Sequence, residues 1–128
     1  MGQGRINNEA LAAIRAAQPR GVRIFDVVPE TTPEGVEDNP EAAGDEFVFK
    51  KIDRSTFTAF KASQRRTQTH GGGGDECTLL ARSLLVWPDD QGVSFDALRE
   101  RAPSITEEFG VMLLADATGG LEVREGKR

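Results

Sequence analysis

The stretch that decides the fold is C-T-L-L-A-R-S-L-L-V-W-P (77–88), followed by F-D-A-L-R-E-R-A-P (95–103) and S-I-T-E-E-F-G-V-M-L-L-A (104–115). In the first block, apolar residues recur at i, i+3, i+4, i+7 and i+8, which is the spacing of one helix face. Val86 and Trp87 extend the apolar end of this helix, and Pro88 cannot continue it. We therefore predict a helix that begins at Cys77 and ends before Pro88.

Two more short helices follow with tight links. Ser94 is suited to cap the second helix, which Pro103 ends. Ser104 and Glu107 fit a capping box for the third helix. The apolar stripe of the third helix consists of Ile105, Phe109, Met112 and Leu113. Three short amphipathic helices with such links are expected to pack together and form the core.

Two strands precede these helices. V-R-I-F-D-V-V (22–28) and F-V-F-K-K-I (47–52) are rich in β-branched and aromatic residues. The segment between them (29–46) carries many carboxylates and no Lys or Arg, so we expect a mobile acidic loop that joins an antiparallel pair. Asp53 or Ser55 can cap the helix that follows, and Phe57 and Phe60 on that helix are expected to enter the core.

These patterns predict an α+β fold, a small antiparallel β-hairpin followed by a bundle of about four short helices. Residues 1–21 form an N-terminal arm, in which Asn8 can cap a short helix that carries Leu11 and Ile14. Residues 22–119 form a single domain with mobile loops at 29–46 and 64–75. Residues 120–128 form a charged tail, in which alternating Leu121 and Val123 fit a short edge strand.

Composition excludes several classes of function. A chain of 128 residues suits one domain, and a net charge of −5 argues against a general nucleic-acid binder. Cys77 is the only cysteine, so no internal disulfide can form and a buried, reduced thiol in the cytoplasm is expected. No stretch approaches the roughly 20 apolar residues that span a bilayer, and no signal peptide is expected.

The sequence offers little catalytic chemistry. His70 is the only histidine and lies in a polar, glycine-rich stretch, so neither a closed zinc site nor a Ser/His/Asp triad is expected. The glycines at 71–74 precede Asp75, whose charge would repel a phosphate. Asp89 and Asp90 fit a turn better than a cation site. We expect no catalytic residue, no metal and no cofactor, and hence no enzyme.

Three successive blocks together resemble the small tail assembly chaperones of long-tailed bacteriophages. They are an apolar helix ending in W-P (87–88), an F-D-A-L-R-E-R-A-P helix and an S-I-T-E-E-F-G helix. The likeness extends upstream to D-E-F-V-F-K-K-I-D-R-S-T-F-T-A-F, so that the matching blocks are 45–60 and 77–119. The resemblance implies a protein of the host cytoplasm that helps tape measure and tail tube proteins to assemble and needs no cofactor.

We therefore expect a non-enzymatic protein-interaction module whose partners are other proteins and that binds neither nucleic acid nor membranes. Self-association into a homo-oligomer is compatible with the sequence. The expected contact residues are Leu11, Ile14, Val86 and Trp87, although Trp87 can equally close the core beside Pro88. The alternative is a structural subunit retained in a phage tail, a capsid or a contractile injection particle. A small enzyme or ligand-binding domain is a third class and would need a pocket with convergent polar groups.

Overall fold

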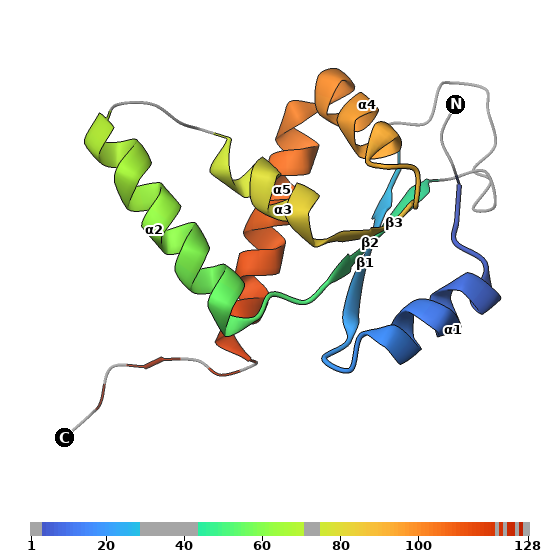
Figure 1. Ribbon diagram of the computed structural model, residues 1–128, viewed down its shortest axis with the longest axis horizontal. Coiled ribbons are helices and arrows are strands. Elements are labelled where there is room, and N and C mark those ends of the chain that lie inside the picture. The colour runs from blue at the N-terminus through green and yellow to red at the C-terminus, as the bar shows by residue number, and fades with distance from the viewer. Residues whose placement is uncertain are drawn as a thin grey trace.

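The computed structural model describes residues 4–28, 44–70, 75–119, 121, 123, 124 and 126, with the backbone alone at 67–70. Five α-helices and a three-stranded antiparallel sheet make up these residues, which confirms the predicted α+β class. The elements are α1 (Asn8–Ala17), β1 (Val22–Val27), β2 (Asp45–Lys50), α2 (Arg54–His70), α3 (Glu76–Leu84), β3 (Leu85–Trp87), α4 (Val93–Arg101), α5 (Pro103–Ala115) and the short 3₁₀ helix η2 (Asp116–Thr118) (Figure 1).

The sheet has the order β1-β2-β3, and the predicted antiparallel pairing of the first two strands is confirmed. Phe25 lies opposite Phe47, and Ile24 lies opposite Val48. The third strand, β3, was not predicted, so the expected hairpin is in fact a three-stranded sheet. On β2, Val48 and Phe49 are adjacent, whereas their partners Trp87 and Leu85 are two residues apart. Val86 is therefore the extra residue of a β-bulge.

Five phenylalanine rings form the centre of the core, between the sheet and α4 and α5. Neighbouring ring centroids lie 5.2 to 6.5 Å apart. Phe109 of α5 contacts four of the rings and stacks on Phe25 with an interplanar angle of 4°. Burying one such side chain stabilises the fold by about 1.5–3 kcal/mol, so this cluster is a major source of stability. Its rings are those of Phe25, Phe47, Phe49, Phe95 and Phe109.

Helices α3 and α5 pack closely at Gly110. A Cβ atom added to Gly110 would lie 2.0 Å from the backbone carbonyl oxygen of Cys77, so glycine alone allows this approach of the two backbones. The buried positions of α5 fall at i, i+3, i+4 and i+7, and they are Thr106, Phe109, Gly110 and Leu113. The predicted stripe is therefore wrong for Met112, which is exposed. Thr106 tolerates burial because its hydroxyl donates a hydrogen bond of 3.0 Å to the carbonyl of Pro103.

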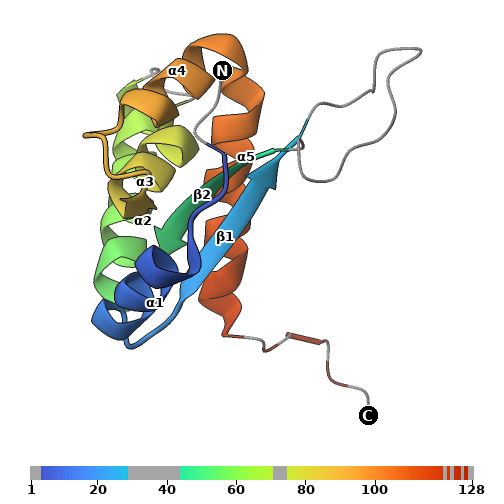
Figure 2. The same ribbon diagram turned by 90° about the vertical axis from the view of Figure 1, so that its right-hand side faces the viewer.

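The opposite face of the sheet carries the N-terminal arm. Figures 1 and 2 show α1 on the side of the sheet away from α5. The amide of Gly4 donates to the carboxylate of Asp45 at 2.8 Å, and the amide of Ile6 donates to Glu46 at 3.1 Å. Asp45 and Glu46 belong to β2, so the acidic loop predicted over 29–46 is wrong for these two residues. Residues 29–43 lie outside the described part of the chain.

Helix α2 is longer than the sequence indicated. It continues through His70, so the loop predicted over 64–75 is wrong for 64–70, while 71–74 lie outside the described residues. The stretch Q-R-R-T-Q (64–68) contains no glycine or proline, so its sequence does not interrupt a helix. Phe60 enters the core as predicted, whereas Phe57 stays half-buried with the ammonium of Lys61 5.7 Å from its ring centroid.

The helix ends differ from three of the predicted caps. Asn7, the residue before Asn8, caps α1 by accepting the amide of Ala10 at 2.7 Å. In the described structure Ser104 does not cap α5, because the helix already begins at Pro103, after Ala102. The cap predicted for α2, the helix after β2, is confirmed for Asp53, whose carboxylate accepts a hydrogen bond from the amide of Thr56 at 2.7 Å. That hydrogen bond is the main cause that lowers the pKa of Asp53.

At α4, an aspartate does the work predicted for a serine. Ser94 lies inside the helix, one residue after Val93, and the carboxylate of Asp90 accepts both its amide at 3.0 Å and its hydroxyl at 2.5 Å. The hydrogen bond from the Ser94 hydroxyl is the main cause that lowers the pKa of Asp90, because it stabilises the ionised carboxylate. Asp90 therefore fixes the turn that leads into α4.

Candidate functional site: a groove at the free edge of the sheet

The sheet ends at β1, and this edge is the first component of the candidate site. Among the described residues, β1 pairs with β2 alone, so the other edge of β1 has no strand beside it. An edge strand presents backbone N–H and C=O groups that can pair with a further strand. The edge is therefore chemically able to bind an extended chain.

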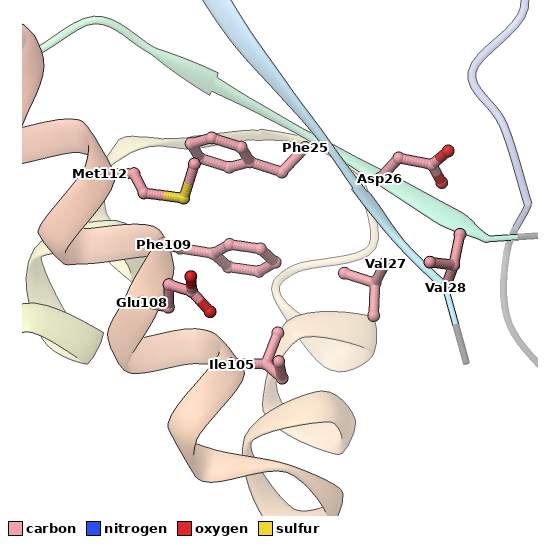
Figure 3. A pocket seen from close by; sticks show the side chains of 8 residues that line it. All are labelled: Phe25, Asp26, Val27, Val28, Ile105, Glu108, Phe109 and Met112. Carbon is pink, nitrogen blue, oxygen red and sulfur yellow. The ribbon is translucent and has the colours of Figure 1, made fainter. Parts of the chain in front are cut away.

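Helix α5 supplies the second component. One side of this helix carries four residues at the spacing i, i+3, i+4 and i+7, namely Ile105, Glu108, Phe109 and Met112. This side faces the last residues of β1 and encloses a hollow of about 250 Å³ (Figure 3). We call this hollow the β1 groove; it is lined by Phe25, Asp26, Val27, Val28, Ile105, Glu108, Phe109 and Met112.

The groove has an apolar floor and an accessible apolar rim. Phe25 and Phe109 are almost fully buried, and their stacked rings form the floor (Figure 3). Val28 and Met112 are 50% and 37% exposed, which is high for large apolar residues. Methionine adapts to different neighbours because its side chain is unbranched and polarisable. The floor therefore fixes the shape of the groove, whereas the rim can adjust to a bound side chain.

Two carboxylates give the groove its charge. Figure 3 shows the carboxylate of Glu108 beside the ring of Phe109, while Asp26 points away from α5. Asp26 forms an ion pair of 3.9 Å with Arg5, but both side chains are about half exposed, so the pair contributes little to stability. The site is thus apolar with one carboxylate, Glu108, on its α5 side, which favours an apolar segment with a basic residue beside it.

The residues predicted from the sequence as partner contacts lie elsewhere. Leu11 and Ile14 are half-buried on α1, and Trp87 is half-buried on β3. Trp87 lies directly opposite Val48, so both side chains are on the sheet face away from the phenylalanine cluster. The fold thus brings Leu11, Ile14 and Trp87 to the same side of the sheet, with Val86 in the bulge. Their role as partner contacts stays a prediction.

A second hollow of about 230 Å³ lies between α2 and α3. Leu79 is its exposed apolar residue. Three of its lining residues carry hydroxyl groups (Thr56, Ser63 and Ser83), and Ser83 already donates a hydrogen bond of 2.7 Å to the carbonyl of Leu80. It also lacks a strand edge with open backbone groups, so the β1 groove is the stronger candidate.

The described residues contain few groups suited to catalysis. Burial raises the pKa of the Cys77 thiol, and the nearby carboxylates of Glu107 and Glu76 raise it further, so the reactive thiolate is disfavoured. No three His, Cys, Asp or Glu side chains in the described ranges are grouped so that they could hold a metal ion. The side chain of His70 is outside those ranges. Within the described part of the chain, no helix has the length and apolar character needed to cross a membrane.

Searches for related proteins give no guidance beyond the geometry: no protein-family model, no curated protein and no solved structure matches this chain.

Proposed function

We propose that this protein is a non-enzymatic protein-interaction module that acts as a tail assembly chaperone of a long-tailed phage, with tape measure and tail tube proteins as its partners. The observation that carries the interaction role is the β1 groove, where a free strand edge and an apolar hollow lie together. The phage assignment depends on the resemblance of the blocks 45–60 and 77–119 to that family.

The groove suits an extended segment of a partner protein. Such a segment can add to the edge of β1 through backbone hydrogen bonds, which supply affinity, while alternate side chains enter the hollow and supply specificity. Because Glu108 borders the groove and the whole chain carries a net charge of −5, basic residues beside the apolar positions would strengthen the contact. The bound segment is therefore expected to be apolar, extended and flanked by Lys or Arg.

A chaperone must also release its client. The groove admits only a few side chains, so the affinity comes from a short segment and dissociation remains fast. The exposed rim at Val28 and Met112 lets the client enter and leave without opening the core. Reversible binding of this kind fits an assembly factor.

Titration of the purified protein with the purified tape measure and tail tube proteins of the same genome tests the proposal. Wild type is expected to bind at least one of them, and Met112→Glu is expected to weaken binding roughly tenfold or more, since it places a charge at the apolar rim. Val93→Glu is the matched control, because Val93 is also an exposed apolar residue but does not line the groove. Absence of binding, or equal binding by both variants, would contradict the proposal.

Mass spectrometry of purified particles separates the chaperone from the retained structural subunit. A chaperone is expected to be absent from the finished particle. Presence of the chain in fixed stoichiometry would favour the structural subunit instead, with the groove as a permanent contact.

A further inference from the structure

The segment after α5 exposes two large apolar side chains. Leu121 is 80% exposed and Val123 is 100% exposed. In L-E-V-R (121–124) they alternate with charged residues, which is the pattern of a strand with one apolar face. Large apolar side chains as exposed as these are suited to pair with another surface.

The fold directs this segment away from the groove of its own chain. An ion pair of 3.2 Å between Asp116 of η2 and Arg23 holds the end of α5 beside the first residues of β1. The amide of Leu121 donates to the carbonyl of Thr118 at 3.1 Å, and the described residues of the segment lie away from the sheet (Figure 2). The β1 groove lies at the other end of β1, from Phe25 onward. The segment is therefore placed to meet a second molecule.

We propose that residues 121–124 of one copy add as a strand to the free edge of β1 in a second copy, with Leu121 and Val123 in its β1 groove. Residues i and i+2 of a strand lie on one face, about 7 Å apart. The apolar side of α5 from Ile105 to Met112 extends for about 10 Å along the helix, so it can hold both side chains. The added strand would continue the sheet over the exposed side of α5.

The charges of the two surfaces agree with this pairing. Residues 121–128 contain three basic residues and two acidic ones, whereas the carboxylate of Glu108 lies at the α5 side of the groove. The contact has a head-to-tail form, since tail and groove are different surfaces of one chain. Two copies can therefore exchange tails and close a dimer. This inference goes beyond the proposed function and does not depend on it, because it concerns the pure protein.

Analytical ultracentrifugation of the full chain over micromolar to millimolar concentrations tests the pairing. The wild-type mass is expected to rise above that of the 13.9 kDa monomer as concentration increases. Two variants are expected to associate at least about tenfold more weakly than wild type. They are the tail variant Leu121→Asp/Val123→Asp and the groove variant Met112→Glu. Val93→Asp, at an exposed position outside the groove, is expected to behave as wild type.

Mixing the two variants provides the decisive arm. The groove variant keeps an intact tail and the tail variant keeps an intact groove, so an equimolar mixture restores one tail-to-groove contact. We expect the mixture to form a heterodimer at concentrations where each variant alone is monomeric. Substitutions at Leu121 and Val123 cannot disturb the core, because both side chains are exposed.

A wild type that remains monomeric throughout, or a tail variant that associates as strongly as wild type, would overturn the pairing. A monomer that nonetheless binds tape measure or tail tube protein would leave the proposed function intact. Self-association without binding of tape measure or tail tube protein would support the pairing and contradict the proposed function.

Discussion

Helix α5 packs against its neighbours in two different ways. Toward α3, the backbones are so close at Gly110 that a methyl group would meet the Cys77 carbonyl. Toward the free edge of β1, the same helix leaves a hollow of about 250 Å³ with Met112 at its rim. Close packing fixes one arrangement, whereas open apolar surface can accept a partner. The α3 side of α5 is thus closed by packing, whereas the β1 side combines a buried floor, which belongs to the core, with an exposed rim available for binding.

The largest expected difference is between the floor and the rim of the β1 groove, in Phe109→Ala against Met112→Ala. Phe109 contacts four other rings of the core, so removing its ring is expected to lower the free energy of unfolding by about 3–5 kcal/mol. Met112 is partly exposed at the groove, and Met112→Ala is expected to cost less than about 1 kcal/mol. Urea unfolding monitored by circular dichroism measures both. Equal losses would show that the rim of the groove carries the fold as much as its floor does.

The next effect is smaller and has an unusual sign. Alanine in place of glycine ordinarily stabilises a helix interior by about 0.5–1 kcal/mol. Gly110→Ala is instead expected to destabilise the protein by about 1–3 kcal/mol, because the new methyl group must push α5 away from Cys77.

The adjacent residue provides a control for this substitution. Val111 is exposed on the same helix, and Val111→Ala is expected to change the free energy of unfolding by less than about 0.5 kcal/mol. Thermal unfolding of the two variants beside wild type makes the comparison. A more stable Gly110→Ala variant would mean that the α3 contact has room to adjust.

Elements with a repeating apolar pattern were predictable from the sequence. The pairing of β1 with β2 was predicted from β-branched and aromatic residues on both, and the buried ring of Phe109 was predicted from helical spacing. Leu85 and Trp87 misled the prediction, because both continue the apolar end of α3 in sequence. They form β3 because β2 has a second edge that needs a partner, and this tertiary requirement is invisible to local periodicity.

The groove was missed for a related reason. Ile105 and Met112 were assigned to one core-facing stripe together with Phe109 and Leu113. On a helix these positions cover a wide arc, and the structure divides the arc between the core and the groove. Glu108, which borders this arc next to Met112, was the available signal, since a carboxylate at the edge of an apolar stripe indicates solvent on that side. Which strand would have a free edge could not be known without β3.

The smallest expected effect on stability concerns the turn before α4. It tests whether the charge of Asp90 in this turn contributes to the packing of α4 against the core. Asp90 accepts the amide and hydroxyl of Ser94, and its lowered pKa means that folding favours the ionised carboxylate. This contribution is present above the unfolded-state pKa of about 3.9 and is lost as the pH falls through the lower folded-state pKa. Hydrogen bonds to an ionised carboxylate are stronger than those to a neutral amide, so Asp90→Asn is expected to cost about 1 kcal/mol at pH 7, a deficit that shrinks in acid. Urea unfolding at pH 7 and in acid measures it, with exposed Asp89→Asn as the control at pH 7. A deficit that stays constant into acid would assign the effect to shape, and α4 would then be held by Phe95 in the core and not by the charge of Asp90.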